Sequence, residues 1–515
     1  MSPNGVRILP VRNPYTGAVD YEISAPAPDE LARTCDRLRT AQVKWAAAPL
    51  EHRIEVLTRW ADELEKAYAA LAAADSEDTG GCLISLMAPR IAVGNVRAWA
   101  ADAPQVLAEA ARSGTSSIVP SISFRTQLVP YPLVGVISPW NGPLLLSLLD
   151  PVPALFAGSA VIVKPSEVAP RFVEPLMATI AAVPELAEVL TFITGDAQTG
   201  QELIGEVDVV CFTGSVPNGR RVAQACAARL IPAYLELGGK DPAIVTASAD
   251  LERAATAVLR GAVSGTGQVC FAIERIYVHE EVHDEFVNLL VGKAARVRLN
   301  FPDASEGEIG PFGFDRQARI AAEHLADAVA RGAVVKCGGP PHTLGGGQFM
   351  RPTVLTEVSH DMLVMREESF APFLPVMRYR SEDEAVALAN DSHYGLSAAV
   401  LAGTAEEAVR IGERINAGTV SLQDTFLTLF KTRDIGTNSF GDSGLGGDRT
   451  GPASILRFLR KKALLTQAAP PAPLARPASP PASPPAPHPA SPPAPPPAPH
   501  PAPPPAPPPA KRIPR

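Results

Sequence analysis

The spacing of apolar and polar residues changes near residue 130 of this chain. Before that point, "DELARTCDRLRTAQVKWAAA" and "EHRIEVLTRWADELEKAYAALAAADSEDTG" carry apolar residues at helical spacing. Acidic and basic residues occupy the opposite face of each stretch, as in amphipathic helices. We therefore predict that residues 1–110 are largely helical.

From Leu133 to Gly238 the pattern becomes one of short β-branched runs separated by helix-length connections. The runs are "LVGVIS", "SAVIVKPS", "LTFITG", "VDVVCFTG" and "AYLELGG". Such alternation predicts βαβ units and a parallel sheet buried on both faces. Ligands bind such sheets at the strands' carboxyl ends, where "SPWNG", "KPSE", "FTGS" and "ELGGK" stand. A second alternating series from Arg275 to Leu422 predicts a second α/β domain.

The C-terminal segment differs from everything before it. Residues 467–515 are dominated by proline and alanine, as in "PPASPPAPHPA". Proline lacks the amide donor that helices and sheets need, so polyproline II or disorder is expected. Docking on a proline-recognising groove is an alternative, but a solvated extension is the favoured interpretation.

The composition of the chain limits the classes of partner that we expect it to bind. Its 515 residues are 46% hydrophobic and 19% charged, with a formal charge of −8. This mild negative charge argues against nucleic acid or an anionic membrane surface as a partner. The most apolar stretch, residues 144–163, is interrupted by Asp150, Pro151, Pro153 and Gly158. It therefore predicts a buried helix followed by a strand, not a membrane span.

The N-terminus lacks the apolar core of a signal peptide. The six cysteines form no CxxC pair and stand near no histidine, so we expect neither disulfides nor a metal site. Free thiols in the cytoplasm are the simplest interpretation.

Two candidate ligand motifs follow predicted strands. Lys164, Ser166 and Glu167 end "VIVKPSE", where a carboxylate can accept hydrogen bonds from ribose hydroxyls; a solvated loop is the alternative. Gly214 and Ser215 precede a predicted helix whose free amides favour phosphate. Alone, each of these signals is weak.

A third motif adds reactive groups. Glu236 and Gly238 lie in "YLELGGK", where the paired glycines allow close backbone approach to a ligand. Cys270 follows in "SGTGQVCFAIERIYV". A thiolate is a strong nucleophile and a carboxylate can serve as base, although a lone cysteine is more often inert. Cys211, within an apolar strand, is expected to be core.

Taken together, the motifs resemble the aldehyde dehydrogenase superfamily. "PWN", "KPSE", "FTGS", "ELGGK", "GQVCFAIERIYV", "EESFAPFLPV" and "ANDSHYGLSAAV" occur in that family's order and spacing. The resemblance runs from "NPYTG" to "FLRKKALL" and leaves out the proline-rich tail. It implies an α/β fold with a Rossmann-type cofactor domain, a second α/β catalytic domain and small oligomerisation strands.

The resemblance also implies catalytic roles. Cys270 attacks the aldehyde and forms a thiohemiacetal, and Asn141 with the Cys270 amide stabilises the oxyanion. Hydride leaves to the cofactor, and Glu236 activates the water that hydrolyses the resulting thioester. A CoA-acylating enzyme, in which CoA resolves the thioester, generally lacks the glutamate. A non-catalytic scaffold with a docking tail is the alternative from another class.

NAD is the implied cofactor, with NADP as the alternative, and no metal is implied. The cofactor-binding positions carried over by the resemblance are Trp140, Lys164, Ser166, Glu167, Gly214, Ser215, Leu237, Gly238, Glu368 and Phe370.

The implied domains divide the chain. Residues 1–110 and 131–238 form the NAD-binding domain, and residues 239–450 form the catalytic domain. Residues 111–130 and 451–466 mediate oligomerisation, most simply as a homodimer or homotetramer. The small-molecule partner is an aldehyde.

Departures from the family pattern leave the substrate open. Ala371 replaces a usual glycine, Gln423 replaces an asparagine, and "SFGDSGLGG" lacks the usual lysine. Leucines of "PLLLSLLD" and the small Ser264 favour an apolar aromatic or aliphatic aldehyde. A semialdehyde would need a cation, for which Lys431 and Arg433 are the candidates.

Overall fold

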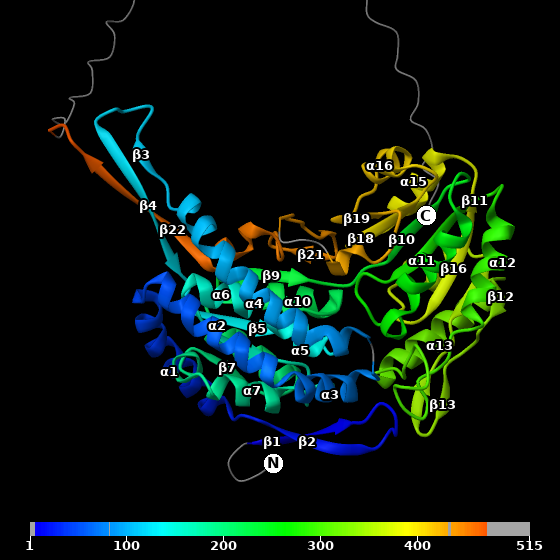
Figure 1. Ribbon diagram of the computed structural model, residues 1–515, viewed down its shortest axis with the longest axis horizontal. Coiled ribbons are helices and arrows are strands. Elements are labelled where there is room, and N and C mark those ends of the chain that lie inside the picture. Colours follow the sequence, from blue (N-terminus) through cyan, green and yellow to red (C-terminus); the bar gives the residue numbers. More distant parts are fainter. Residues whose placement is uncertain (1–5, 82, 431–433, 471–515) are drawn as a thin grey trace, which may run out of the picture. The chain divides into compact units, whose positions relative to one another are not determined.

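Two sheets organise the protein, seen here in a computed structural model (Figure 1) that describes residues 6–81, 83–430 and 434–470. Within that part, residues 115–123 and 466–470 group apart from the remainder. In the smaller group, the Ser116 amide donates to the Ile122 carbonyl over 2.8 Å. Most of the proline-rich tail, residues 471–515, lies outside the described residues.

The N-terminal region begins with a β-hairpin that the apolar pattern did not predict. Its strands β1 (Arg7–Arg12) and β2 (Val19–Ala25) pair antiparallel. Most positions of both strands are exposed or half-buried, so the strands lack the apolar runs of the central strands. The predicted helices follow as α1 (Pro28–Ala47), α2 (Leu50–Lys66), α3 (Tyr68–Thr79) and α4 (Leu83–Ala110).

The first large sheet contains the five predicted strands. They are β5 (Leu133–Ile137), β6 (Ala160–Lys164), β7 (Leu190–Phe192), β8 (Val209–Thr213) and β9 (Ala233–Glu236). The order is β21-β9-β8-β5-β6-β7, and all neighbours are parallel except the edge strand β21 (Gly444–Leu445). Strand order reverses between β5 and β8, the kind of switch point at which open α/β sheets bind ligands.

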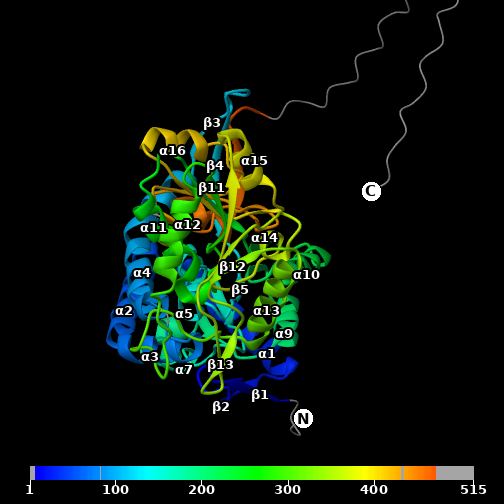
Figure 2. The same ribbon diagram turned by 90° about the vertical axis from the view of Figure 1, so that its right-hand side faces the viewer.

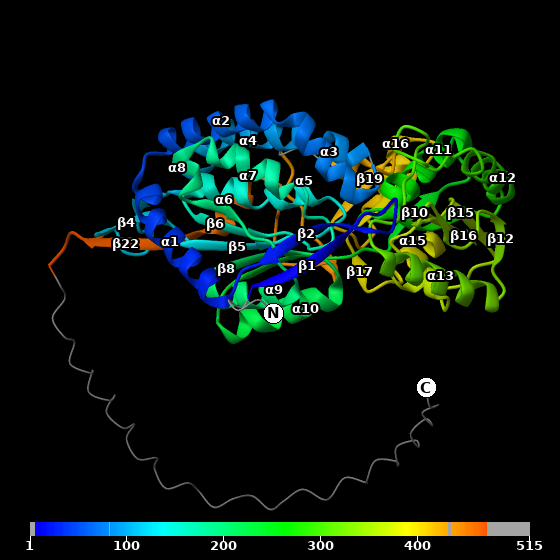
Figure 3. The ribbon, with the colours of Figure 1, turned by 90° about the horizontal axis from the view of Figure 1, so that it is seen from below.

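Helices cover both faces of this sheet (Figure 3). On one face, α9 (Ala197–Glu206) and α10 (Val216–Ala228) pack against the strands. On the other lie α6 (Pro151–Ala157) and α7 (Val173–Ala181), with α2 and α4 outside them. Burial on both faces explains why these strands read as unbroken apolar runs.

The stretch at 144–163 is buried, but it forms two helices instead of one. α5 (Pro143–Leu148) ends before Asp150, and α6 begins at Pro151. Prolines are favoured at the first positions of a helix and disfavoured inside it, so Pro151 and Pro153 start a new helix. Asp150 lies at the break between the two helices.

The second sheet has seven strands in the order β12-β15-β16-β11-β10-β18-β19. Only β12 runs antiparallel to its neighbour. The bounds are β10 (Asp241–Val245), β11 (Ile273–His279), β12 (Val334–Cys337), β15 (Thr353–Thr356), β16 (Phe373–Tyr379), β18 (Ser397–Leu401) and β19 (Thr419–Leu422). The predicted second α/β series is therefore present.

Helices again lie on both sides of the sheet (Figure 2). α11 (Leu251–Val263) and α12 (His283–Ala294) lie on one face. α13 (Asp315–Ala330) and α15 (Glu382–Asn390) lie on the other. The remaining short helices are α8 (Pro184–Ala187), α14 (Leu363–Arg366), α16 (Ala405–Gly412), η1 (Ser264–Gly267), η2 (Leu427–Phe430) and η3 (Pro452–Phe458).

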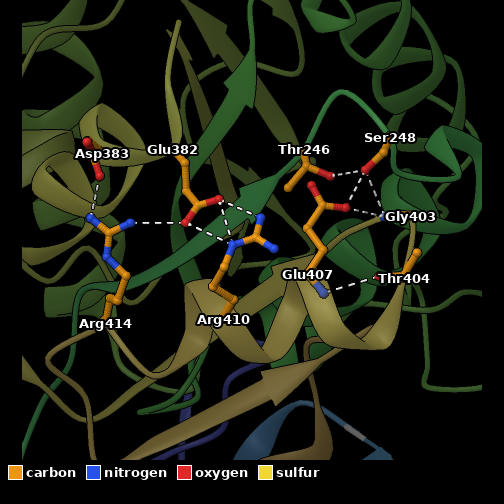
Figure 4. A network of polar contacts seen from close by, with 9 residues as sticks. All are labelled: Thr246, Ser248, Glu382, Asp383, Gly403, Thr404, Glu407, Arg410 and Arg414. Atoms are coloured by element: carbon orange, nitrogen blue, oxygen red, sulfur yellow. Dashed lines mark hydrogen bonds and ion pairs between the residues drawn. The ribbon is translucent and has the colours of Figure 1, made fainter.

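A polar network joins α15 and α16 at the surface of this second sheet (Figure 4). Glu382 accepts hydrogen bonds from Arg410 at 2.7 Å and from Arg414 at 3.0 Å. Glu407 accepts from the Ser248 hydroxyl at 2.5 Å, which ties α16 to the segment after β10. Because these side chains are exposed, each pair contributes little to stability.

Smaller strands complete the chain. β22 (Leu459–Gln467), β4 (Ile122–Pro130) and β3 (Ser113–Thr115) form a three-stranded sheet in that order. Two short pairs are β13 (His342–Leu344) with β14 (Gly347–Phe349), and β17 (Tyr394–Gly395) with β20 (Phe440–Gly441). Among the described helices, none has the length and apolar character needed to cross a bilayer.

Candidate active site

The candidate site lies where the chain passes from the first sheet to the second. Glu236 is the last residue of β9, and β10 begins five residues later. A Cβ atom at Gly239 would lie 2.8 Å from the Cys270 carbonyl oxygen, and one at Gly238 would lie 2.4 Å from Oε2 of Glu368. Only glycine permits these approaches. The glycine pair, directly after the segment of Glu236, thus lies against both Cys270 and Glu368.

The loop before Cys270 has an unusual backbone. Gly265, Thr266 and Gly267 have φ angles of 59°, 61° and 73°, a left-handed turn that β-branched Thr266 adopts at a cost. The Thr266 hydroxyl donates to the Gly310 carbonyl over 2.9 Å. The backbone of Ala371 packs so closely that a Cβ at Gly267 would lie 2.4 Å away. These contacts fix the loop that carries the cysteine.

The surroundings of Cys270 keep its thiol protonated. Burial raises its pKa to about 12, and the nearby carboxyls of Glu236, Asp241 and Glu368 add to the rise. The Arg449 guanidinium acts in the opposite direction. Burial also raises the pKa of Asp241 and of Glu368 to about 8. In the protein without a bound ligand, Cys270 is therefore a neutral thiol close to several carboxyl groups.

Asn141, just after β5, reaches the nucleophile loop. Its Nδ2 atom donates to the Gln268 carbonyl over 2.9 Å. Gln268 is buried, and its side chain accepts from the Gly313 amide over 3.0 Å. Because an amide nitrogen carries two hydrogens, one bond fixes Asn141 and one hydrogen remains for an oxyanion. Gln268 was not predicted as a site residue, although it stands within "GQVC".

Glu236 is held by a distant segment. The Ser439 hydroxyl donates to its Oε2 atom over 2.8 Å, and Gly444 of β21 pairs with its backbone. Ser439 and Gly444 belong to "SFGDSGLGG", the stretch that departs from the family pattern. Sequence reasoning did not give Ser439 a role, because its partner is 203 residues away.

Lys164, Ser166 and Glu167 cluster at the end of β6. The buried Lys164 ammonium lies 3.3 Å from Oε2 of the half-exposed Glu167, and burial lowers the pKa of Lys164. The Ser166 hydroxyl accepts from the Val168 amide. The Glu167 carboxylate is thus oriented and accessible, as an acceptor of ribose hydroxyls must be.

Gly214 and Ser215 precede α10. Ser215 is the N-cap residue, yet its side chain makes no capping bond, so the first amides of the helix are left for a ligand. Leu237 packs so tightly that a Cβ at Gly219 would lie 2.4 Å from it. Free helix amides after β8 and an oriented carboxylate after β6, on the two sides of β5, fit a dinucleotide with its pyrophosphate at α10.

Glu368 and Phe370 are supported by a buried ion pair that the motifs did not reveal. Glu274 accepts hydrogen bonds from the amides of Ser369 and Phe370, both over 2.7 Å. It also accepts from the Lys240 ammonium over 2.5 Å. The Glu368 carboxyl accepts from the Gly239 amide over 3.2 Å. A charged residue within the apolar run "CFAIER" was the available signal for Glu274.

An aromatic group borders the same loop. Phe370 has a φ of 52°, and its ring meets the edge of Trp140 at a centroid distance of 5.6 Å. The Trp140 ring also contacts Phe314, at 6.0 Å. Trp140 and Phe370, both predicted near the cofactor, therefore lie together.

The other cysteines are distinct from Cys270. Cys211 is buried within β8, as predicted, and the five cysteines in the described part of the chain are free thiols. Cys82 lies outside the described residues. Across the same residues, histidines, cysteines and acids form no group of three that is suited to a metal ion.

A nucleotide-binding type of parallel sheet joined to a second α/β sheet, with a cysteine at the junction, defines a dehydrogenase-like class of enzyme. The family model described as "Aldehyde dehydrogenase family" matches residues 1–464, and the chain belongs to this family. It is therefore an oxidoreductase that acts on aldehydes with NAD(P). The α/β aldehyde dehydrogenase-like fold is confirmed.

Relatives and solved structures agree on the family. A putative aldehyde dehydrogenase, PutA, from Anabaena variabilis is 49% identical, with a TM-score of 0.87 over 90% of this chain and 98% of that one. Betaine aldehyde dehydrogenase from Staphylococcus aureus, in complex with NAD+, is 28% identical, with a TM-score of 0.84 over 90% and 92%.

Curated relatives carry different substrate names. A 4,4'-diapolycopene aldehyde oxidase from a Methylomonas species is 35% identical over 78% of this chain and 75% of its own length. A putative succinate-semialdehyde dehydrogenase [NADP(+)] from Mycolicibacterium smegmatis is 32% identical over 89% and 88%. These names do not agree on one aldehyde.

Proposed function

We propose that this protein oxidises an apolar aldehyde to the carboxylic acid, with Cys270 as nucleophile, Asn141 as oxyanion donor and Glu236 as the base that activates water. The observation that carries the proposal is the close packing of Gly239, three residues after Glu236, against the carbonyl oxygen of Cys270. The effect of the Glu236 carboxyl on the Cys270 pKa supports that proximity.

The residues act in sequence. The Cys270 thiol gives its proton to solvent, its sulfur bonds to the aldehyde carbon, and the electron pair of the carbonyl double bond moves onto the oxygen. The second hydrogen of the Asn141 amide and the Cys270 N–H stabilise the oxyanion. When bound, NAD(P) supplies the acceptor for the hydride that leaves that carbon. Glu236 then takes a proton from water, hydroxide attacks the thioester on Cys270, and the C–S bond breaks to release the acid.

Retention of Glu236 separates this proposal from its alternatives. A CoA-acylating enzyme has no need of a water-activating carboxylate beside its thiol. A non-catalytic scaffold has no need of Cys270, Glu236 and Asn141 together. Hydrolysis of the thioester is therefore the reaction that the site supports best.

For the cofactor, we propose a preference for NAD over NADP. The Glu167 carboxylate attracts a free ribose 2′-hydroxyl and repels a 2′-phosphate. The Lys164 ammonium, 3.3 Å away, reduces this repulsion. Binding of NAD+ by the Staphylococcus aureus enzyme supports the preference, and the NADP(+) name of the mycobacterial relative supports NADP as the alternative cofactor.

An apolar substrate is supported by the side chains nearest the nucleophile. Phe271 follows Cys270 directly, and its ring packs against Phe426 at a centroid distance of 5.2 Å. Leu146 is half-buried on α5, but Leu145 is buried in the core. An apolar ring or chain gains about 25 cal/mol per Å² buried. An unpaired carboxylate would lose its hydration without compensation.

The basic side chains considered as partners for the carboxylate of a semialdehyde either contact other groups of the protein or lie outside the described residues. Arg260 forms an ion pair with Asp424, and Arg253 donates to the Gln423 carbonyl over 3.1 Å. Lys431 and Arg433, the candidates from sequence, lie outside the described residues.

We further propose that the first sheet with α1–α4 binds NAD and the second sheet carries the catalytic cysteine. The exposed three-stranded sheet of β3, β4 and β22 would join subunits into a homodimer or homotetramer. β22 is an edge strand that exposes Leu465 at 69% of its surface, a feature suited to pairing. Because Cys270 must stay reduced, we place the enzyme in the cytoplasm.

NADH production on mixing with NAD and benzaldehyde tests the proposed function. Cys270→Ala should abolish it while NAD binding, followed by protein fluorescence, persists. Cys337→Ala, which removes a half-buried thiol of β12, is the matched control and should retain activity. Substantial turnover by the Cys270→Ala enzyme would exclude the mechanism.

A further inference from the structure

The carboxylate of Glu236 has a hydroxyl partner that comes from a distant part of the chain. Ser439 donates a hydrogen bond to its Oε2 atom over 2.8 Å, and both side chains are half-buried. Among the described residues, none donates a hydrogen bond to the other oxygen, Oε1. The carboxylate is therefore held at one oxygen, while the second can accept a proton from water.

The segment that carries Ser439 also pairs with the backbone around Glu236. Gly444, five residues later, pairs with Glu236 in the ladder of β21 and β9. The Leu237 amide donates to the Ser443 carbonyl over 2.8 Å. A Cβ atom at Gly444 would lie 2.7 Å from the Cβ of Ser439, so the turn between them is tight. One short stretch thus holds both the backbone and the side chain of Glu236.

Packing on both sides of Ser439 fixes the position of its hydroxyl. Before it, the Asn438 carbonyl oxygen would lie 1.8 Å from a Cβ atom at Gly418, so only glycine admits the segment there. After it, β20 pairs antiparallel with β17. These contacts involve the backbone and not the serine hydroxyl. Ser439→Ala should therefore leave the segment in place and remove only the bond to Glu236.

The bond from Ser439 limits the freedom of a flexible side chain. Glutamate has several rotatable bonds, and only some of its conformations direct an oxygen toward the water that attacks the thioester. A hydrogen bond to a fixed hydroxyl removes much of this freedom before the reaction begins. In the proposed function, attack by the thiol and departure of the hydride do not use Glu236. The effect of the bond is therefore confined to hydrolysis.

We propose that Ser439 is a positioning residue that directs the Glu236 carboxylate toward the hydrolytic water and acts in thioester hydrolysis alone. The proposal rests on the role of Glu236 in the proposed function. Ser439 belongs to "SFGDSGLGG", which departs from the family pattern, so the resemblance assigned it no role. Its hydroxyl acts through Glu236 and not on the substrate.

The experiment measures the two half-reactions separately. Rapid mixing with benzaldehyde and NAD gives the rate of the first NADH burst. Rapid quench with mass spectrometry gives the rate at which the benzoyl adduct on Cys270 decays. Ser439→Ala should slow this decay by about tenfold and leave the burst rate within about twofold of wild type. Ser439→Thr keeps a hydroxyl and should restore the decay rate.

A matched control removes a serine hydroxyl from another glutamate. Ser248 donates to Oε2 of Glu407 on α16 over 2.5 Å, in the exposed network of Figure 4. Ser248→Ala should leave both rates unchanged. Equal slowing of burst and decay in Ser439→Ala would show a structural role and overturn the proposal, as would an unchanged decay rate.

A second variant covers the case in which Ser439→Ala does not fold. Ser439→Cys replaces the hydroxyl by a thiol, which is a weaker donor, and should slow the decay of the adduct selectively. Decay at the wild-type rate in Ser439→Cys, together with a failure of Ser439→Thr to differ from it, would overturn the proposal.

Glu236→Gln separates this proposal from the one on which it rests. If that variant hydrolyses the thioester at the wild-type rate, the role of Glu236 itself is wrong. If it stalls while Ser439→Ala behaves as wild type, only the role of Ser439 is wrong. Adding Ser439→Ala to Glu236→Gln should slow the residual decay no further, because the hydroxyl acts through the carboxylate. Further slowing in the double variant would contradict that coupling and overturn the proposal.

Discussion

The ammonium of Lys240 lies 2.5 Å from Oε2 of Glu274, and both side chains are almost fully buried. Lys240 stands four residues after Glu236, and Glu274 stands four residues after Cys270. The pair therefore links the segment that carries the proposed base to the segment that carries the nucleophile. Through the amides of Ser369 and Phe370, Glu274 also fixes the loop of Glu368.

Lys240→Met should lower the free energy of unfolding by about 3 kcal/mol, because Glu274 would remain buried without its cation. It should also raise the KM for NAD, since the Glu368 loop depends on Glu274. Urea denaturation and cofactor titration measure the two effects. Arg414→Leu, which removes an exposed ion-pair partner, is the control and should change stability by less than about 1 kcal/mol. An unchanged KM for NAD in Lys240→Met would contradict this link.

Because the pKa of His324 is lowered in the folded protein, we expect the protein to lose stability in mild acid. Burial, with help from the nearby Lys240 charge, lowers its pKa from 6.5 to about 4. Between those values the unfolded chain binds a proton that the folded protein does not, so stability falls as the pH falls. The contribution is about 3 kcal/mol. His324→Gln should flatten the dependence of unfolding free energy on pH between 6.5 and about 4. An equally steep fall in the variant would reject this assignment.

Glu167 predicts the direction of cofactor choice. Glu167→Gln should increase the ratio of kcat/KM for NADP to that for NAD by about tenfold, since a negative charge no longer faces the 2′-phosphate. Steady-state kinetics with both cofactors measure it. Glu188→Gln, at the exposed C-cap position of α8, serves as a control of equal charge change. If the wild-type enzyme prefers NADP, the Lys164 ammonium and not the Glu167 carboxylate determines the choice of cofactor.

Substrate choice is tested by comparing kcat/KM for benzaldehyde, hexanal and succinate semialdehyde. The phenyl rings of Phe271 and Phe426 lie beside the nucleophile. We therefore expect kcat/KM to be higher for benzaldehyde and for hexanal than for succinate semialdehyde. Phe271→Ala should lower kcat/KM for benzaldehyde by more than for acetaldehyde, because a small aldehyde gains little from the ring. Succinate semialdehyde as the best substrate would point instead to the basic residues at 431–433.

The central strands could be predicted because burial on both faces leaves an unbroken apolar run in each. β1 and β2 could not, since their exposed faces mix polar residues into the pattern. The two-residue strand β21 carries no periodic signal at all. Its pairing with β9 depends on a chain segment about two hundred residues away.

Recognisable motifs in the sequence contain Cys270, Glu236 and Asn141. The residues that hold the site in place stand outside such motifs. Ser439 reaches Glu236 across 203 positions, and Arg449 reaches Asp150 across 299. Asp150 stands in an apolar stretch, where a buried carboxylate needs a cationic partner. Nothing in the spacing of residues identified which arginine would supply it.

Intact-protein mass spectrometry of the Glu236→Gln enzyme tests the central claim most directly. On mixing with NAD and benzaldehyde, the account predicts one equivalent of NADH and a benzoyl adduct that persists on Cys270, because hydride departs before water attacks. The Cys270→Ala enzyme should form neither. Rapid steady-state turnover by Glu236→Gln without an adduct, or an adduct on another residue, would contradict the assignment of Cys270 as nucleophile and Glu236 as base.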